Sequence, residues 1–446
     1  MARDKGHCAM MGDSYSPIDS SDDFKKQRRT EHKIRLTRLL AAFSILLNIL
    51  LITSFIASGI IMRMIHQNEQ NSSPSTDTSS SGLSVQWNRT TFRSPIGGRL
   101  PCSRRLLVAS TTSPTDANQV RPADIKYIAA MGDSYMTGYL SYTSKTEEID
   151  EMRNFVGNSF ATGGEGEMET HLTLANVLRH LNPTLTGFST GQGMKEEQTN
   201  LNVAIPGMWT DDMQRQAREL IRRFGKYSPN SVEQDWKLIN IFVGVRDISG
   251  FCIGQGGTDK PEFKRNLTEA IAILQNALPK SIISIIAPPN LDFMFGASLI
   301  VAQIPSMSCN LVNFGLIAQR RTELYREAII EIVAESQNKS RNDQVVIAQH
   351  IFDNLWEPLR KPDGSYQTDF YAADFFHLSN YGNSLVAKQL WNQLVSPDHL
   401  KFSSNALMAD ERPDLICPEF KCPFIRTPAN SAACIMSEEN VIAGTM

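Results

Sequence analysis

Five short, uninterrupted runs of apolar residues are spaced along the second two-thirds of the chain. They are rich in β-branched side chains and do not alternate between apolar and polar positions, which is typical of strands buried on both faces of a parallel sheet. The runs cover residues 126–131, 200–205, 237–243, 281–287 and 344–348. We therefore expect five parallel strands.

Between these runs lie segments with mixed apolar and charged faces, as amphipathic helices have. The clearest cover residues 171–181, 211–224, 264–278, 311–336 and 380–394. Alternation of strands and helices predicts an α/β fold, in which helices cover both faces of a parallel sheet. The sequence shows no internal repeat and no glycine-rich phosphate loop of the G-x-x-x-x-G-K type.

Residues 39–62 form a different pattern, because all 24 of them are uncharged and most are apolar. A helix of this length spans the hydrocarbon core of a bilayer, which is about 30 Å thick. A cleaved signal peptide is the alternative, but its apolar stretch is usually about 7–15 residues long and follows a short basic start. We predict an uncleaved transmembrane signal-anchor.

The charges on either side of this segment predict its orientation. Residues 1–38 contain nine Lys or Arg, whereas residues 63–82 contain one, Arg63. The positive-inside rule then assigns residues 1–38 to a cytosolic tail and the rest to the extracellular or luminal side, as in a single-pass type II protein of the plasma membrane. The outer part carries four candidate N-glycosylation sites, Asn71, Asn88, Asn266 and Asn338.

Six of the seven cysteines also lie on the predicted outer side, where disulfides form. They are Cys102, Cys252, Cys309, Cys417, Cys422 and Cys434. Six cysteines allow 15 sets of three disulfides, and free buried thiols are the alternative. We consider a Cys252–Cys309 bond and one bond among the last three cysteines.

Composition divides the outer part into three regions. Eight of the twelve residues 71–82 are Ser or Thr, which is typical of a stalk, and we assign residues 63–123 to it. Residues 124–400 form the predicted domain, and residues 401–446 form a Cys-containing extension that packs on it. The net charge of -3, from 44 Lys+Arg and 47 Asp+Glu, argues against a nucleic-acid partner.

The candidate chemistry lies at the carboxyl ends of the predicted strands, where reactive groups gather in such folds. Ser134 follows the first strand, and His377 with Asp374 precedes the last helix. A serine hydroxyl needs a base to remove its proton, and a carboxylate can orient and stabilise that histidine. The three residues therefore predict a Ser–His–Asp triad.

The sequence contains its own control for this interpretation. Gly-Asp-Ser also occurs at residues 12–14, and Asp-x-x-His also occurs at residues 4–7, in the charged tail where no strand is predicted. Each short motif by itself is therefore weak evidence for a catalytic site. Only the positions of the second copies, beside the predicted strands, favour them as catalytic residues. The alternative is that Ser134 caps a helix and that His377 is an ordinary loop residue.

Several segments, in order, resemble the GDSL/SGNH hydrolases and, within them, the phospholipase B branch. The resemblance covers roughly residues 124–430, and Tyr135 stands where the family usually has Leu. The segments are 129–138 (AAMGDSYMTG), 169–193, 201–207 (LNVAIPG), 235–247 (DWKLINIFVGVRD), 374–379 (DFFHLS) and 417–430.

The resemblance implies a flavodoxin-like three-layer α/β/α sandwich with a five-stranded parallel sheet and without metal or cofactor. It implies that Ser134 is the nucleophile, that Asp374 and His377 complete the triad, and that Ser134 and Gly207 donate to the oxyanion. It also implies phospholipids, lysophospholipids or other acyl esters as substrates, cleaved through an acyl-enzyme.

One position departs from the family. Arg246 stands where the family has the asparagine that is the third oxyanion donor. Arginine carries N–H donors and a charge that could hold an oxyanion or a lipid phosphate, but it is longer than asparagine. The leading interpretation is a membrane-anchored phospholipase B-like esterase. The alternatives are a non-catalytic protein that binds lipid or a partner, and an esterase acting on acetyl or other esters.

Overall fold

The structure is a computed structural model, and the residues it describes belong to one of two compact units of the chain. This unit covers Trp87–Met446. The described residues are 93–142, 154–250, 257–290, 293, 311–338, 341–374, 376–401 and 405–434. The predicted tail and the predicted span at 39–62 lie outside them, as do Asn71 and Asn88. Within the described ranges, no helix combines the length and the apolar character that a membrane span requires.

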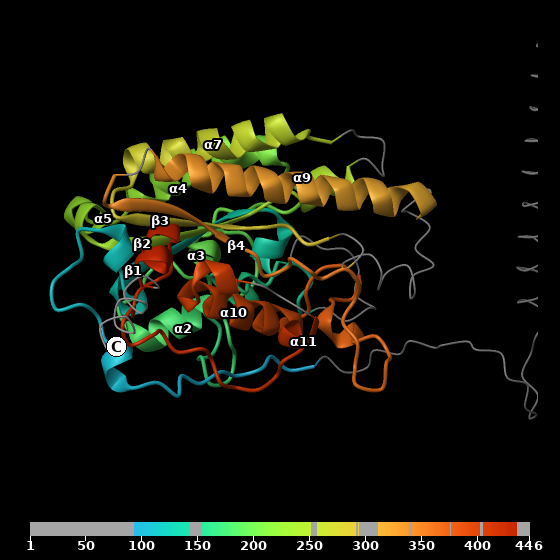
Figure 1. Ribbon diagram of the computed structural model, residues 1–446, viewed down its shortest axis with the longest axis horizontal. Coiled ribbons are helices and arrows are strands. Elements are labelled where there is room, and N and C mark those ends of the chain that lie inside the picture. Colours follow the sequence, from blue (N-terminus) through green and yellow to red (C-terminus); the bar gives the residue numbers. More distant parts are fainter. Residues whose placement is uncertain are drawn as a thin grey trace, which may run out of the picture. The chain divides into compact units, whose positions relative to one another are not determined.

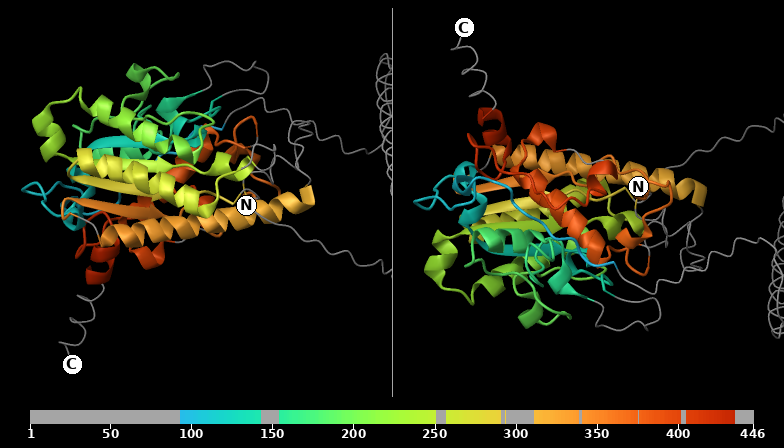
Figure 2. Two further views of the ribbon diagram at one scale, coloured as in Figure 1. Left: turned by 90° about the horizontal axis from the view of Figure 1, so that it is seen from above. Right: turned by 90° about the horizontal axis from the view of Figure 1, so that it is seen from below.

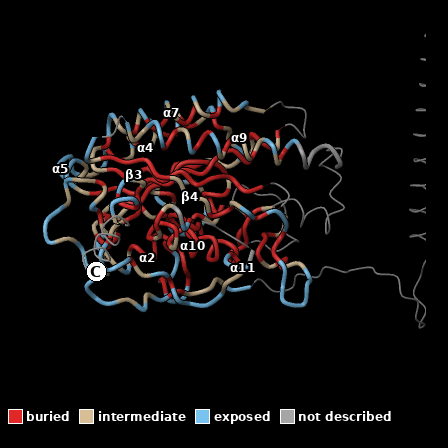
Figure 3. The backbone as a smooth tube through the Cα atoms, in the orientation of Figure 1, coloured by how far each residue is buried: buried red, intermediate tan, exposed pale blue. Residues whose placement is uncertain are grey.

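Four parallel strands form the sheet, in the order β1-β2-β3-β4. Their bounds are Ile125–Gly132 for β1, Trp236–Phe242 for β2, Ser281–Ile286 for β3 and Gln344–Gln349 for β4. Almost every residue in them is buried, as Figure 3 shows, which explains the uninterrupted apolar runs. The prediction of a strand is thus confirmed for four of the five runs.

The prediction of a fifth strand at residues 200–205 is wrong for the sheet as it is described. This segment forms one isolated bridge with β1, between Ala130 and Asn202, and one further backbone hydrogen bond, from Ile205 to Gly132, but no continuous ladder. A second isolated bridge, between Tyr127 and Thr186, occupies the earlier part of the same edge. Two short segments therefore share the outer edge of β1, and neither pairs with it over enough residues to form a strand.

Helices cover the two faces of the sheet (Figures 1 and 2). On one face α4 (Met213–Phe224), α7 (Lys260–Ala277) and α9 (Leu311–Gln337) lie side by side. On the other face α2 (Leu174–Leu181) contacts α10 (Asn380–Val395), and α11 (Asn405–Met408) lies beside α10. The connections contain the short helices α3 (Glu196–Thr199), α5 (Pro229–Gln234) and α6 (Val245–Ser249). The three-layer α/β/α arrangement predicted from the sequence is present.

Helix α4 shows how the sequence produces this packing. Its buried apolar residues recur with helical spacing on one face, and each of the three large ones, Met213, Leu220 and Phe224, contributes roughly 1.5–3 kcal/mol by leaving water. The fourth is Ala217. Most charged residues of the helix lie away from this face, as Arg222 does with its half-exposed side chain, whereas the side chain of Arg223 is largely buried.

Residues 93–123 were expected to belong to the stalk, and this expectation is wrong because the segment packs on the domain. Its backbone pairs with the loop before α2, where the N–H of Leu172 donates to the carbonyl of Ile96 at 2.8 Å. A disulfide joins Cys102 to Cys417, across 315 residues of sequence. The folded unit therefore includes this N-terminal arm and ties it to the C-terminal extension.

Of the two disulfides considered from the sequence, the structure describes one. A second disulfide joins Cys422 to Cys434, within the group of three cysteines where one bond was expected. Cys252 and Cys309 lie outside the described residues.

The two described glycosylation sequons differ in how far their asparagine is exposed to solvent. Asn338 is exposed just after the end of α9. Asn266 is buried in α7 with 5% of its surface exposed, so a glycan has no access to its amide, and the prediction of a glycosylation site there is wrong.

Candidate active site

Ser134 lies where the first strand ends and the chain turns sharply. Strand β1 ends at Gly132, and the 3₁₀ helix η4 begins at Ser134 and runs to Thr137. Gly132 has a φ of +142°, and a side chain there would place its Cβ only 1.9 Å from the carbonyl oxygen of Phe242. Only glycine fits this turn, which brings Ser134 to the carboxyl edge of the sheet.

The carboxyl group of Asp133 caps η4. Its Oδ1 accepts a hydrogen bond from the backbone N–H of Tyr135 at 3.1 Å. The side-chain amide of Gln216 on α4 bonds both backbone groups of Gly132, at 2.8 and 2.9 Å. The backbone before Ser134 is therefore held both by its own cap and by a helix of the covering layer.

The structure brings Ser134 together with His377 and Asp374, across 243 residues of sequence. Nε2 of His377 lies 2.7 Å from Oγ of Ser134, and its Nδ1 lies 2.5 Å from Oδ2 of Asp374. The other carboxylate oxygen, Oδ1 of Asp374, accepts from the backbone N–H of Phe376 at 3.0 Å and of His377 at 2.9 Å. This geometry suits proton transfer from the serine to the imidazole, with the carboxylate behind it.

The pKa values of the two carboxyl groups of the site shift in opposite directions, although burial raises both. For Asp374 it raises the pKa, but the charge of His377 and the hydrogen bonds to that residue and to Phe376 outweigh it, so the pKa lies below its usual range. For Asp133, burial raises the pKa to about 8, with a smaller contribution from the nearby carboxyl of Asp247. At neutral pH, Asp374 is ionised and Asp133 is mainly protonated.

Three aromatic rings surround the imidazole of His377. The ring centres of Tyr135, Tyr139 and Phe376 lie 5.1, 4.7 and 5.0 Å from that of His377. The hydroxyl of Tyr135 also donates to the carbonyl of Phe376 at 2.7 Å, which joins η4 to the histidine loop. No role was predicted for these rings from the sequence. Their closeness in sequence to Ser134 and His377 was the one sign that these rings would lie at the site.

An open cleft of about 340 Å³ lies beside the serine and the histidine. Gly207 lines it, is exposed, and has a φ of +73°. Arg246, in the first turn of α6, lines it as well, and the centre of its guanidinium lies 5.3 Å from the centre of the Trp209 ring. The residues that line the cleft are Asp133, Ser134, Tyr139, Pro206, Gly207, Val245, Arg246, Ser249, Phe376 and His377.

Asp247 connects the two loops that carry Gly207 and Arg246. It is fully buried, and its carboxylate accepts from the backbone N–H of Thr210 at 3.1 and 3.3 Å and from the hydroxyl of Thr258. Burial raises the pKa of Asp247, although these hydrogen bonds oppose the shift. The residue therefore orders the loops on either side of the cleft.

Comparison with known proteins agrees with this arrangement. The family model of the GDSL-like lipases and acylhydrolases matches residues 128–390. The chain belongs to this family. The matched range includes all three residues of the Ser134–His377–Asp374 arrangement, most of β1 and all of β2, β3 and β4, so the fold is that of the GDSL/SGNH hydrolases.

Among curated proteins, the chain is similar to membrane-associated phospholipase B1. It is 30% identical to the mouse protein over 331 residues, which is 72% of this chain and 22% of that protein. It is 30% identical to the human protein over 358 residues, which is 76% of this chain and 24% of that protein. The chain thus belongs to the phospholipase B-like part of the family, while it spans about a quarter of the length of these relatives.

A similarity to solved structures is much weaker. The chain is 11% identical to phospholipase A1 from Streptomyces albidoflavus, with 58% of this chain and 95% of that chain covered and a TM-score of 0.30.

Proposed function

We propose that this protein is a membrane-anchored serine esterase that hydrolyses acyl esters of phospholipids and lysophospholipids through an acyl-enzyme. The observation that carries the proposal is the short contact between Oγ of Ser134 and Nε2 of His377, with Asp374 on the far side of the imidazole. Membership of the acylhydrolase family supports ester hydrolysis as the reaction.

In the proposed reaction, Oγ of Ser134 attacks the ester carbonyl carbon while His377 takes the hydroxyl proton. The carbon–oxygen bond to the glycerol then breaks, and the imidazolium returns that proton to the leaving alkoxide. Water attacks the acyl-serine in the same way, with His377 as base, and releases the fatty acid and the free serine. Ionised Asp374 stabilises the imidazolium in both halves of the reaction.

The negative charge of the tetrahedral intermediate needs hydrogen-bond donors. We assign this role to the backbone N–H groups of Ser134 and Gly207, both of which line the cleft. Arg246 lines the same cleft in place of the third donor of the family. Its length makes it a less well placed donor than asparagine, so we expect turnover to be slower than a complete oxyanion hole would allow.

The charges of the cleft favour a phosphate-bearing substrate. Arg246 is the one Lys or Arg among the described lining residues, and Asp133, beside the nucleophile, is mainly neutral at pH 7. A guanidinium binds phosphate oxygens through paired N–H donors, and Trp209 packs against this guanidinium. The names of the relatives, membrane-associated phospholipase B1, support the same substrate class.

The topology in this proposal rests on the sequence. The uncharged segment 39–62 and the basic residues before it support a type II anchor with the esterase domain on the outer side. The disulfides Cys102–Cys417 and Cys422–Cys434 support an oxidising compartment. Asn71, Asn88 and Asn338 are the glycosylation sites of this proposal.

A serine-reactive fluorophosphonate probe tests the proposal on the full chain in detergent. We expect the wild type to be labelled and to release fatty acid from a lysophospholipid. Ser134→Ala should lose both properties, whereas Ser14→Ala, in the other Gly-Asp-Ser sequence, should keep them. A wild type that is neither labelled nor active on any ester would contradict the proposal and favour the non-catalytic binding protein that Arg246 suggests.

A further inference from the structure

The segment 200–205 leads directly to Gly207, and its backbone is bonded along one edge, by β1 and by the carbonyl of Gly187, which accepts from the N–H of Leu201 at 3.2 Å. Its three backbone hydrogen bonds to β1 run from Ala130 N to Leu201 O, from Val203 N to Ala130 O and from Ile205 N to Gly132 O. Successive residues of an extended chain point their backbone groups in alternating directions. The carbonyl of Asn202 therefore faces away from β1, toward a side where the described sheet has no further strand. The carbonyl of Asn200 belongs to the turn just before it, where the φ of Asn200 is +50°.

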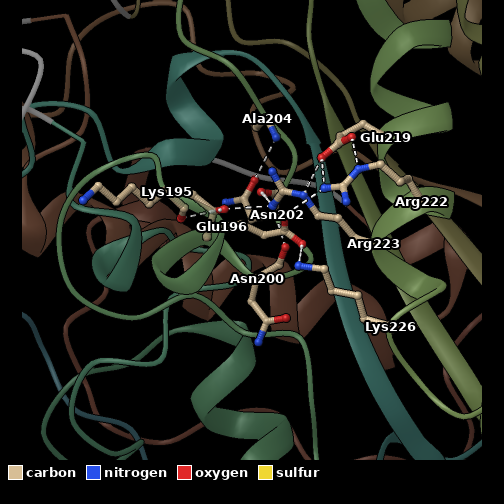
Figure 4. Close-up of polar contacts among 10 residues, drawn as sticks. Lys195, Glu196, Asn200, Asn202, Ala204, Glu219, Arg222, Arg223 and Lys226 are labelled. Atoms are coloured by element: carbon tan, nitrogen blue, oxygen red, sulfur yellow. Dashed lines mark hydrogen bonds and ion pairs between the residues drawn. The ribbon is translucent and has the colours of Figure 1, made fainter.

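Arg223 of α4 binds these two carbonyls. Its Nη1 donates to the carbonyl of Asn200 at 2.5 Å, to that of Asn202 at 3.1 Å and to the hydroxyl of Thr199 at 2.8 Å. Its Nε donates to Oε1 of Glu219, one helical turn earlier, at 2.9 Å. The side chain of Arg223 is only 12% exposed, so these hydrogen bonds are largely shielded from water. Figure 4 shows the guanidinium between Glu219 and the Asn200–Asn202 backbone.

The same segment also contacts the helix that begins with Ser134. The side-chain amide of Asn202 donates to the carbonyl of Met136 in η4 at 2.8 Å, and its oxygen accepts from the N–H of Ala204 at 3.1 Å. A displacement of residue 202 would therefore move both proposed oxyanion donors. It would move Ser134 through η4 and Gly207 through the chain that follows.

We propose that Arg223 is a positioning residue of the esterase, whose guanidinium holds the segment 200–205 so that the N–H groups of Gly207 and Ser134 converge on one oxyanion. The inference rests on the proposed function. Arginine suits this role because its planar group presents several N–H donors in a fixed geometry, with little further loss of entropy when they bind. In effect it replaces the neighbouring strand that the segment lacks.

The orientation of Arg223 does not depend on pH in the working range of an esterase. Hydrogen bonds from Arg222 and Arg223 lower the pKa of Glu219 to about 2, although burial opposes the shift. Glu219 therefore stays ionised and keeps its hold on Nε of Arg223 at any pH where His377 could act as a base.

A neighbouring cation supplies the matched control. Lys226 belongs to the same charged cluster in Figure 4, but its side chain pairs with Glu196 at 2.6 Å and is 60% exposed. An exposed pair of this kind contributes little to stability. Lys226→Met thus removes a positive charge near Arg223 without removing the hydrogen bonds to the segment 200–205.

The experiment compares the full-length wild type with Arg223→Met, Arg223→Lys and Lys226→Met on one lysophospholipid. Reactive sites are counted by the end point of fluorophosphonate labelling, so that kcat refers to folded molecules only. We expect Arg223→Met to lower kcat and the labelling rate by about 10- to 100-fold, with KM within about twofold, because a shift of about 1 Å at a reacting centre has such effects. Arg223→Lys, which can still reach one carbonyl, should be intermediate, and Lys226→Met should match the wild type.

A merely structural role would lower the melting temperature of Arg223→Met and leave its kcat per labelled site unchanged, which would overturn the inference. If Arg223→Met does not fold, Arg223→Lys decides, since an unchanged kcat in that variant also overturns it. A wild type that hydrolyses no ester overturns the proposed function and the inference together. An active wild type with equally active Arg223 variants overturns the inference alone.

Discussion

Asp133 and Asp374 are two carboxyl groups of one site that hold opposite protonation states at neutral pH. Asp374 remains ionised because His377 and two backbone N–H groups stabilise its negative charge. For Asp133, next to the nucleophile, burial raises the pKa to about 8, because the backbone N–H of Tyr135 and its own N–H oppose the shift too weakly and no positive charge among the described residues stabilises the carboxylate. The number of hydrogen bonds and the nearby charge, rather than burial alone, decide which carboxyl can serve as the partner of a base.

The first prediction concerns Asp374. Asp374→Asn should lower kcat by about 10³–10⁴-fold, because the amide cannot stabilise the imidazolium and favours the wrong tautomer of His377. Hydrolysis of a lysophospholipid by the full chain measures the effect. Asp363→Asn, at an exposed aspartate in the loop before the histidine, is the control and should retain full activity. Equal rates for Asp374→Asn and the wild type would contradict the assigned role.

The second prediction concerns the protonation of Asp133. In the unfolded chain its pKa is about 3.9, whereas in the folded protein it is about 8, so the folded state binds more protons between these values. Stability is then lost as the pH rises from about 4 to 8, on the order of 1 kcal/mol per pH unit from this group.

Asp133→Asn removes this titration and keeps an oxygen acceptor for the N–H of Tyr135. We expect the variant to gain stability relative to the wild type, and to gain more at pH 8 than at pH 5. Urea unfolding of both proteins in detergent at the two pH values measures this difference. Asp211→Asn, at an exposed site, is the control. A difference between Asp133→Asn and the wild type that does not grow with pH would show that Asp133 is ionised in the folded protein.

The third prediction separates the two proposed effects of Arg246. In Arg246→Asn, turnover of a neutral short-chain ester should rise by up to about 10²-fold, because the better placed amide completes the oxyanion hole. For a lysophospholipid the same variant should show a higher KM, because the phosphate loses its cationic partner.

Arg218→Asn removes an exposed positive charge from α4 and is the control, for which both substrates should be unaffected. If Arg246→Asn raises the turnover of both substrates and leaves the KM for the lysophospholipid unchanged, a phosphate-binding role is wrong. If neither responds and both rates are high, Arg246 has no part in the reaction.

The fourth prediction tests topology and burial together. Glycosidase treatment of membranes that contain the protein should increase its electrophoretic mobility. Asn338→Gln should remove one glycan from the wild-type set, because this residue is exposed after α9. Asn266→Gln should leave the number of glycans unchanged, because Asn266 is buried. Absence of any mobility shift would contradict an extracellular or luminal domain.

The local pattern of the sequence was sufficient to predict most elements of the fold. Uninterrupted β-branched runs became β1 to β4, and segments with helical spacing became α2, α4, α7, α9 and α10. These signals are local, because a strand buried on both faces leaves an uninterrupted apolar run in consecutive residues, and a helix with one apolar face leaves a periodic one. The pair Ser134 and His377 could also be proposed from positions at strand ends and from resemblance to a family.

What only the tertiary structure decided depends on neighbours that are far apart in sequence. The run at residues 200–205 has the apolar character of a strand, but Thr186 occupies part of the edge of β1 that it would need. Asn266 has a complete sequon, but the packing of α7 buries it. Residues 93–123 lack a regular apolar pattern, yet backbone pairing and the Cys102–Cys417 disulfide attach them to the domain.

The contacts of Arg223 belong to the same class. In the sequence it is one of several charged residues near the end of a helix, as Arg222 is. Helical spacing places Arg223 at the border of the apolar face and Arg222 opposite that face, but it does not predict which groups Arg223 binds. In the structure Arg222 is half exposed and pairs with carboxylates, whereas Arg223 turns inward and binds the carbonyls before Gly207. The sequence determined which side chains are available, because composition and spacing are local. The tertiary structure decided their partners, because burial and hydrogen bonding depend on which distant segment fills the space beside each residue.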